Sequence, residues 1–239
     1  MAILLATNLV YYAGWDVLNS HAVSFVLAAM FLYVWVKTKS SLLLGALLGM
    51  MISVRTQDAV FGILLLTRQN KIRAIFGVAI AMLPQLWIWQ HFYNWQIPYL
   101  GTGQNFDWFG PHIWGVLTNV KTGIIWTSPI VLVGWWGLRK LAWPLKLAVL
   151  AQIYVVASWN AWDQAAAYGP RMLISGFPIV ALGLNRVRKS WWVLAVLVVL
   201  NLAMIVRFHL WIKEPTVDMG VETKVRAVQK IRQLIYWGR

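Results

Sequence analysis

The sequence contains no cysteine. This absence excludes disulfide bonds, thiolate nucleophiles and metal sites with cysteine ligands. Acidic residues are scarce, since the 239 residues include seven Asp and Glu against 21 Lys and Arg. The signatures of soluble enzymes are missing too, because no Gly-x-Ser-x-Gly elbow, Walker lysine loop or dinucleotide fingerprint occurs. The four histidines form no His-x-x-x-His pair, so their spacing predicts no metal site.

Apolar side chains dominate what is present. Hydrophobic residues make up 60% of the sequence and charged residues 12%, and 17 residues are Trp. This composition differs from that of ordinary soluble domains and is typical of a protein that lies in lipid. The net charge of +14 comes from small basic clusters between apolar runs, a pattern of cytoplasmic loops rather than of a nucleic-acid surface. We therefore expect a membrane protein with no nucleic-acid partner.

The apolar runs predict an all-α fold, a polytopic bundle of transmembrane helices that occupies residues 1–210. A helix needs about 20 apolar residues to cross the hydrocarbon core, so the run 2–14 is interpreted as part of a membrane helix. The runs that follow it predict about eight membrane segments. They occupy residues 20–36, 42–54, 59–66, 74–89, 123–138, 141–159, 172–184 and 191–208.

Two of these segments, residues 42–54 and 59–66, are too short to be ordinary spans. We interpret them as the arms of a hairpin of short or tilted helices. The polar tip of this hairpin, Arg55 to Asp58, then lies at membrane depth and needs contact with protein or with a water-filled cavity.

Two further segments are predicted to lie outside the bundle. Residues 90–122 are rich in Gly, Pro and Trp, which predicts an external interfacial loop with room for one short helix in the membrane plane. Residues 211–239 form a C-terminal tail in which apolar residues recur at spacings of three and four. This periodicity predicts an amphipathic helix on the membrane surface.

The charges sort between the two sides of the predicted membrane domain. Ten Lys and Arg fall in turns on one side, whereas all seven acidic residues can be placed on the other. Short loops rich in Lys and Arg are retained in the cytoplasm. The sorting therefore predicts a multi-pass protein whose acidic side faces outward.

Polar residues at the outer ends of different spans are candidates for a site, because ionisable groups near the membrane need a partner or a function. The candidates are Asp16, His21, Arg55, Asp58, His112, Lys121, Asp163, Tyr168 and Arg171. An outward-facing cavity lined with cations suits an anionic lipid headgroup, since Arg presents a fork to phosphate and Lys a point charge.

Simpler roles are open for several of these residues. Arg55 and Asp58, three residues apart, can pair with each other instead of binding phosphate. Lys121 and Arg171 can act as interfacial anchors beside the spans that they flank. His21 follows a possible N-cap residue at a helix start, where a lone histidine is more often structural than catalytic.

Several short motifs occur in a defined order along residues 2–184. They are Ala6–Tyr12, Asn19–Ala22, Leu44–Gly49, Val54–Asp58, Gly110–Leu117, Lys121–Gly123, Thr127–Pro129, Tyr168–Leu173 and Phe177–Pro178. Taken together, these motifs resemble the C-terminal portion of bacterial membrane glycosyltransferases of the GT-C class, relatives of the dolichyl-phosphate-mannose protein mannosyltransferases.

The resemblance implies a transferase of the bacterial cytoplasmic membrane that takes a sugar from polyprenyl phosphate at the outer face. The acceptor would be a glycan, a lipid or a protein. The lipid phosphate is then the leaving group, and Arg55, Lys121 and Arg171 match positions that could hold it. Tyr168 is a further donor to this phosphate. A carboxylate would deprotonate the acceptor or position a divalent cation.

The key acid of that family normally lies in a first external loop, upstream of the motifs found here. We therefore expect either that Met1 is an internal start or that the usual catalytic loop is missing. Asp16 is the first external acid of this sequence and the candidate base, although its context resembles a later loop. The alternative function is non-catalytic: a lipid-phosphate carrier, or a scaffold subunit of a cell-envelope glycan pathway, would use the same cations without a base.

Overall fold

The computed structural model describes residues 1–17, 19–95, 105–164, 167–187 and 191–212. These residues form helices and connecting turns, and no β-strand occurs among them. The predicted all-α fold is therefore confirmed for the described part of the chain. Most of the tail for which an amphipathic helix is predicted, from residue 213 onward, lies outside the described residues.

The helices are mostly short, and several are separated by a single turn. In chain order they are α1 (Ala2–Leu5), α2 (Leu9–Gly14), α3 (Ser20–Lys37), α4 (Ser41–Val54), the 3-10 helix η1 (Thr56–Thr67), α5 (Lys71–Tyr93), α6 (Ile113–Thr118), α7 (Ile124–Thr127), α8 (Ile130–Leu138), α9 (Trp143–Ser158), the 3-10 helix η3 (Arg171–Gly176), α10 (Phe177–Leu184), α11 (Trp191–Arg207) and the π-helical turn η4 (Phe208–Ile212).

Three of the described helices are long and apolar enough to cross a membrane. They are α3, α5 and the continuous helix Trp191–Leu210, with 18, 23 and 20 residues. At 1.5 Å per residue these helices are about 27–35 Å long, which matches the hydrocarbon core of a bilayer. Shorter apolar helices of 10–17 residues are also present. The structure therefore supports a membrane protein, but it does not reproduce about eight full-length spans.

Two apolar runs that were expected to be single spans are broken. Residues 123–138 divide into α7 and α8 at Ser128 and Pro129, because proline has no N–H to donate and occupies the position before α8. Residues 172–184 begin as the 3-10 helix η3, and α10 starts only at Phe177.

The hairpin predicted for the two short arms is present. α4 and η1 contact each other and are joined at Arg55, whose extended backbone (φ −151°) ends one helix before the next begins. The tip is held against protein, since Asp58 is fully buried. In the predicted external loop, α5 continues to Tyr93 and the short helix α6 follows later.

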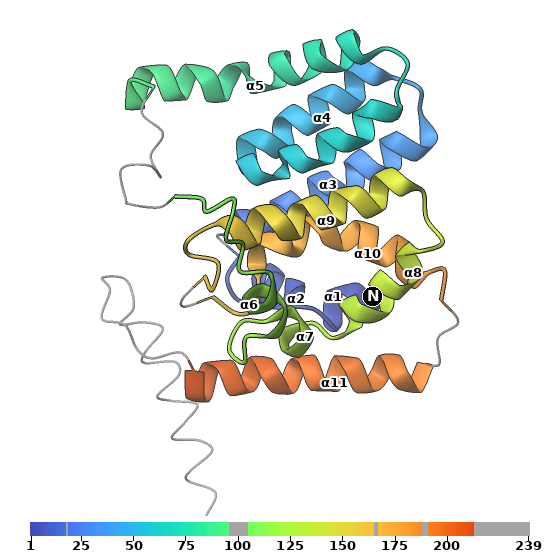
Figure 1. Ribbon diagram of the computed structural model, residues 1–239, viewed down its shortest axis with the longest axis vertical. Helices are drawn as coiled ribbons and strands as arrows, with labels where there is room; N and C mark the ends of the chain where they lie inside the picture. Colours follow the sequence, from blue (N-terminus) through green and yellow to red (C-terminus); the bar gives the residue numbers. More distant parts are fainter. Residues whose placement is uncertain (18, 96–104, 165–166, 188–190, 213–239) are drawn as a thin grey trace, which may run out of the picture.

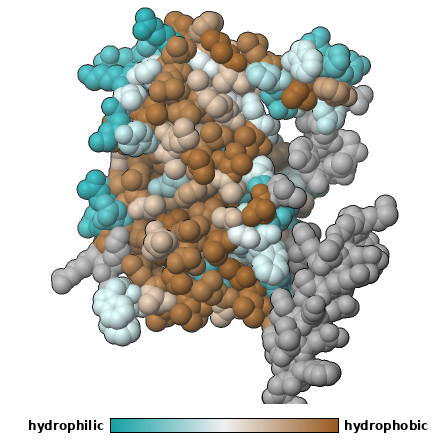
Figure 2. All heavy atoms as spheres, turned by 180° about the vertical axis from the view of Figure 1, so that it is seen from behind, coloured by the Kyte–Doolittle hydropathy of each residue, from teal (hydrophilic) through white to brown (hydrophobic). Residues whose placement is uncertain are grey.

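The longer helices lie side by side in a stack, with α5 and α11 on opposite outer sides (Figure 1). In each outer helix, 11% of the residues of the apolar window are buried, so most of their hydrophobic side chains face outward. Figure 2 shows the molecule from behind. A hydrophobic band lies between one strongly hydrophilic edge and an opposite edge that is more polar than the band. Such a band is typical of a protein surface that faces the hydrocarbon core.

The basic turns gather at one end of this stack, where the turns after α3, η1, α8 and α10 lie on the right of Figure 1. Arg68 donates hydrogen bonds to backbone carbonyls at the end of α3, and Lys140 Nζ donates to Arg186 O at 3.2 Å. The start of α3 lies at the opposite end, about 27 Å away along an 18-residue helix. Arg188 and Lys189, also expected in this group, lie outside the described residues.

Glycines let α4 and α5 approach each other closely. A Cβ atom added to Gly45 would lie 1.9 Å from Ala74 O, and one added to Gly77 would lie 2.2 Å from Leu42 O. Gly45 and Gly49 form a small-x-x-x-small pattern, through which membrane helices pack by van der Waals contact. This contact holds α5 against the bundle, because the buried residues of α5 are Ala74 and Gly77, both of which face α4.

Replacing Gly45 with Ala should therefore separate α4 from α5. We expect Gly45→Ala to lower the free energy of unfolding by about 1–3 kcal/mol, because the added methyl overlaps backbone atoms. Gly62→Ala is the matched control, since its Cβ would lie 3.5 Å from Leu48 Cδ2, an ordinary contact. Thermal unfolding of the purified protein in detergent measures both variants, and equal melting temperatures would contradict the expectation.

Candidate functional site

The tip of the α4–η1 hairpin brings Arg55 to the start of α3. Its guanidinium Nη1 donates to Ser20 Oγ at 3.0 Å and lies 3.3 Å from His21 Nε2. His21 is 2% exposed, whereas Arg55 is half-buried. The arginine thus contacts the first turn of α3 and keeps part of its side chain accessible.

Asp58, on the first turn of η1, is fully buried. Ser24 donates a hydrogen bond to one carboxylate oxygen, and Ser175 donates to the other at 2.7 Å. Arg55 also attracts this carboxylate electrostatically, as expected if the two residues pair. Gln152 Nε2 donates to Ser175 Oγ at 2.6 Å and extends the network to α9.

Two side-chain amides hold η3, one from the hairpin tip and one from α9. Gln57 Nε2 donates to Met172 O at 2.7 Å, and Gln152 Nε2 lies within 3.2 Å of the same oxygen. Because Arg171 precedes Met172 in the chain, these contacts hold the arginine beside the tip. Arg171 is half-buried.

The two arginines converge on one histidine. Arg55 and Arg171 both interact electrostatically with His21. The N-terminus of α3, which carries His21, adds the partial positive charge of an 18-residue helix. Two half-buried arginines beside a helix N-terminus form a region of positive potential, which favours an anion such as phosphate.

Asp16 lies at the border of this region. Its backbone N–H donates to Tyr11 O at 3.0 Å, and the side chain is half-buried. The Tyr11 phenol interacts electrostatically with both Asp16 and Arg171. The carboxylate and the arginine are therefore both close enough to influence the same phenol group.

Tyr168 is fully buried and its hydroxyl belongs to another network. The hydroxyl donates to Asn201 Oδ1 on α11 at 3.0 Å, while the backbone N–H donates to the Tyr12 hydroxyl at 3.1 Å. Burial raises the pKa of the Tyr168 phenol above its usual value, so the group is a neutral donor. These contacts give Tyr168 a role in joining α2 to α11, in contrast to the phosphate contact expected from sequence.

Three other candidates are exposed and do not belong to the contacts around His21. Lys121 lies in the turn between α6 and α7, where its backbone N–H donates to Asn119 Oδ1. His112 stacks on Trp162 with a ring-centroid distance of 5.2 Å. Asp163 is exposed in the turn after α9.

Sequence reasoning missed the neutral members of the network, namely Ser24, Gln57, Gln152 and Ser175. The signal for three of them was present, since Ser24, Gln152 and Ser175 interrupt apolar runs that were expected to be spans. Among the described residues, no group of three His, Asp or Glu side chains could hold a metal ion. The divalent cation implied by the family resemblance therefore has no ligand cluster in that part of the chain.

The chain matches no family model, no curated protein and no solved structure. We define the cationic site as Arg55, Arg171 and His21 with the neighbouring Asp16. It lies at the end of the bundle opposite the basic turns.

Removing the buried carboxylate should destabilise the protein. We expect Asp58→Ala to cost about 2–5 kcal/mol, because the Ser24 and Ser175 hydroxyls lose their acceptor inside the bundle. Asp163→Ala, at an exposed carboxylate, is the control and should change stability by less than about 0.5 kcal/mol. Chemical unfolding in detergent measures the difference; a loss equal to that of the control would rule out a stabilising network.

Proposed function

We propose that this protein is a membrane glycosyltransferase whose donor is a sugar linked to polyprenyl phosphate. The observation that supports the proposal is the convergence of Arg55 and Arg171 on His21 at the start of α3. The family resemblance supplies the reaction class, and the cationic site supplies a place for the donor phosphate.

In this reaction the lipid phosphate leaves with a growing negative charge. Two arginines already in position stabilise that charge without reorganising, which lowers the barrier for transfer. Ser20 Oγ accepts a hydrogen bond from Arg55 Nη1 and holds it in place. The Gln57 side-chain amide donates to Met172 O and keeps the Arg171 segment close. The same groups that bind the phosphate therefore assist its departure.

Asp16 is the proposed base that takes the proton of the acceptor hydroxyl. Asp58 is unsuited to this task because both of its oxygens accept hydrogen bonds inside the bundle. Asp107 is engaged in a turn, where it accepts from the backbone N–H groups of Phe109 and Gly110. Asp16 is half-buried and, like Arg171, interacts electrostatically with the Tyr11 phenol.

The proposed setting is the bacterial cytoplasmic membrane, with the cationic site facing outward and the basic turns in the cytoplasm. The polyprenyl chain would lie in the bilayer and present its phosphate to the arginines. The acceptor is a glycan, lipid or protein.

The scarcity of candidate bases among the described acids favours the non-catalytic alternative, a lipid-phosphate carrier or a scaffold subunit. Among the described acids, Asp16 alone combines partial exposure with an electrostatic link to the cationic site. A binding protein needs the two arginines and no base. The two functions therefore differ in whether Asp16 is required.

Removing either arginine should weaken binding of the lipid donor. We expect Arg55→Ala and Arg171→Ala each to lower affinity for polyprenyl phosphate by about 10–100-fold, the usual effect of losing a charged hydrogen bond. Lys121→Ala removes an exposed cation outside the site and serves as the matched control. Binding to protein in nanodiscs measures the effect, with thermal unfolding to verify the fold. Affinities equal to those of the parent would exclude both arginines from the site.

Replacing the proposed base should separate binding from chemistry. We expect Asp16→Asn to retain polyprenyl-phosphate binding and to slow transfer of radiolabelled sugar in vesicles by about 10²–10⁴-fold. Asp163→Asn is the control for loss of an acidic side chain elsewhere. Full activity in the Asp16 variant would exclude this residue as the base. A parent protein that binds the lipid but transfers no sugar would favour the carrier or scaffold.

A further inference from the structure

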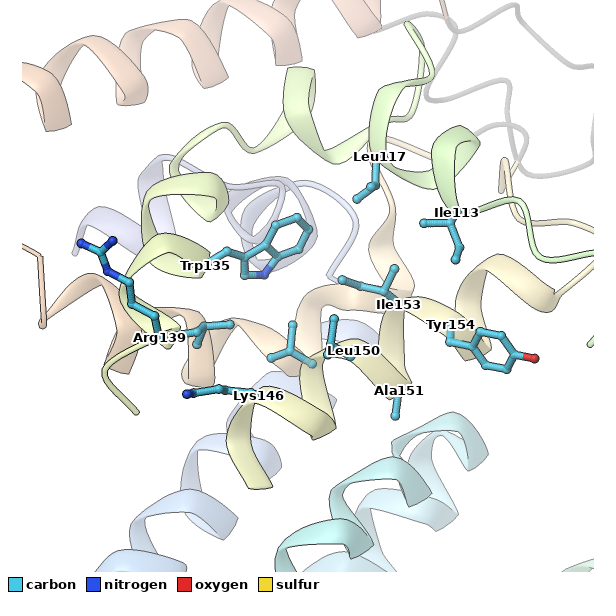
Figure 3. Close-up of a pocket in the computed structure, with 11 residues that line it drawn as sticks. Ile113, Leu117, Trp135, Arg139, Lys146, Leu150, Ala151, Ile153 and Tyr154 are labelled. Atoms are coloured by element: carbon cyan, nitrogen blue, oxygen red, sulfur yellow. The ribbon is translucent and has the colours of Figure 1, made fainter. Parts of the chain in front are cut away.

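An apolar groove lies between α6, α8 and α9, apart from the cationic site (Figure 3). Its volume is about 770 Å³, within the range of roughly 300–1,000 Å³ that is typical of ligand pockets. Trp135, Leu150 and Ile153 are among the hydrophobic side chains that line it. None of Arg55, Arg171 and their partners contributes to the lining.

The groove has two cations, and both lie at the same end. Figure 3 shows Arg139 and Lys146 at one end of the lining, with Ile113 and Tyr154 at the other. Lys146 and Tyr154 are both on α9, so the groove follows that helix for about 12 Å at 1.5 Å per residue. The Arg139 guanidinium lies over the Trp136 ring, with Cζ 3.9 Å from the ring centroid.

The direction of the groove matches the direction of a lipid chain. In Figure 1, α9 and the membrane-length helix α3 run along the same direction of the bundle, so a chain in the groove would lie along the bundle. The charged end coincides with the basic end of the bundle, where Lys140 contacts Arg186. A phosphate placed there would lie at the level of the headgroups, where juxtamembrane cations attract anionic lipid.

We propose that this groove binds one anionic phospholipid, with an acyl chain along α9 and the phosphate at Arg139 and Lys146. An apolar groove by itself would accept the chain of any lipid. The two cations at its end favour a negatively charged headgroup over a zwitterionic one, because Arg and Lys attract and hydrogen-bond phosphate oxygens. The site lies at the end of the bundle opposite the cationic site and does not depend on the proposed transferase function.

Native mass spectrometry of the protein released from vesicles of equal phosphatidylglycerol and phosphatidylcholine tests this site. The parent should retain phosphatidylglycerol preferentially. The double variant Arg139→Ala/Lys146→Ala should lower the retained phosphatidylglycerol by about tenfold, because two attractive charges are lost. The matched control, Lys71→Ala/Arg73→Ala, removes one exposed Lys and one exposed Arg from the same end of the bundle. It should leave retention of phosphatidylglycerol unchanged.

A second variant tests the groove itself. Leu150→Trp places a larger side chain in the lining and should reduce retention of both lipids. Retention of phosphatidylglycerol at the parental level in Arg139→Ala/Lys146→Ala would overturn the proposal, as would an equal loss in the Lys71/Arg73 control. Failure of polyprenyl phosphate to bind at Arg55 and Arg171 would leave these results unaffected, so the two proposals can fail separately.

Discussion

Burial of the Asp58 carboxylate constrains much of this structure. A carboxylate removed from water inside a bundle that lipid surrounds is costly unless hydrogen bonds and a positive charge compensate it. The compensation comes from Ser24 on α3, Ser175 on η3 and the nearby Arg55. Three segments that are distant in the chain therefore have to meet at one carboxylate. Arg171 opens η3, so the contacts that satisfy Asp58 also bring the second arginine to the start of α3.

Close packing of glycines adds to two buried hydrophobic clusters in holding the helices together. Besides the contact of α4 with α5, α8 packs on α10 so closely that a Cβ added to Gly137 would lie 1.9 Å from Gly183 O. Membrane helices gain little from the hydrophobic effect among themselves, so van der Waals contact at such positions has to supply the stabilisation. This contact positions α8 beside α9, which defines one wall of the groove that ends at Arg139.

Part of the fold and of the site was predictable because it depends on local pattern. Apolar runs predicted helices, the two short arms predicted a hairpin, and the costly charges at its tip identified Arg55 and Asp58 as candidates. Other features depend on partners more than 100 residues away. The hydrogen bond between Ser175 and Asp58 spans 117 residues, and no local signal pairs these two side chains. In the same way, nothing near Tyr168 indicates that its backbone N–H meets the Tyr12 hydroxyl, 156 residues away.

By itself, the sequence determined an all-α, strongly apolar protein with basic turns between its apolar runs, because hydrocarbon excludes charge wherever the chain crosses it. Only the tertiary structure decided which cations meet. It brings Arg55 and Arg171 to His21 and leaves Lys121 exposed in another turn, although all three cations resembled site residues in sequence. The reason is that hydrophobic patterning places residues at an end of the bundle, whereas hydrogen bonds between distant segments select the neighbours within that end.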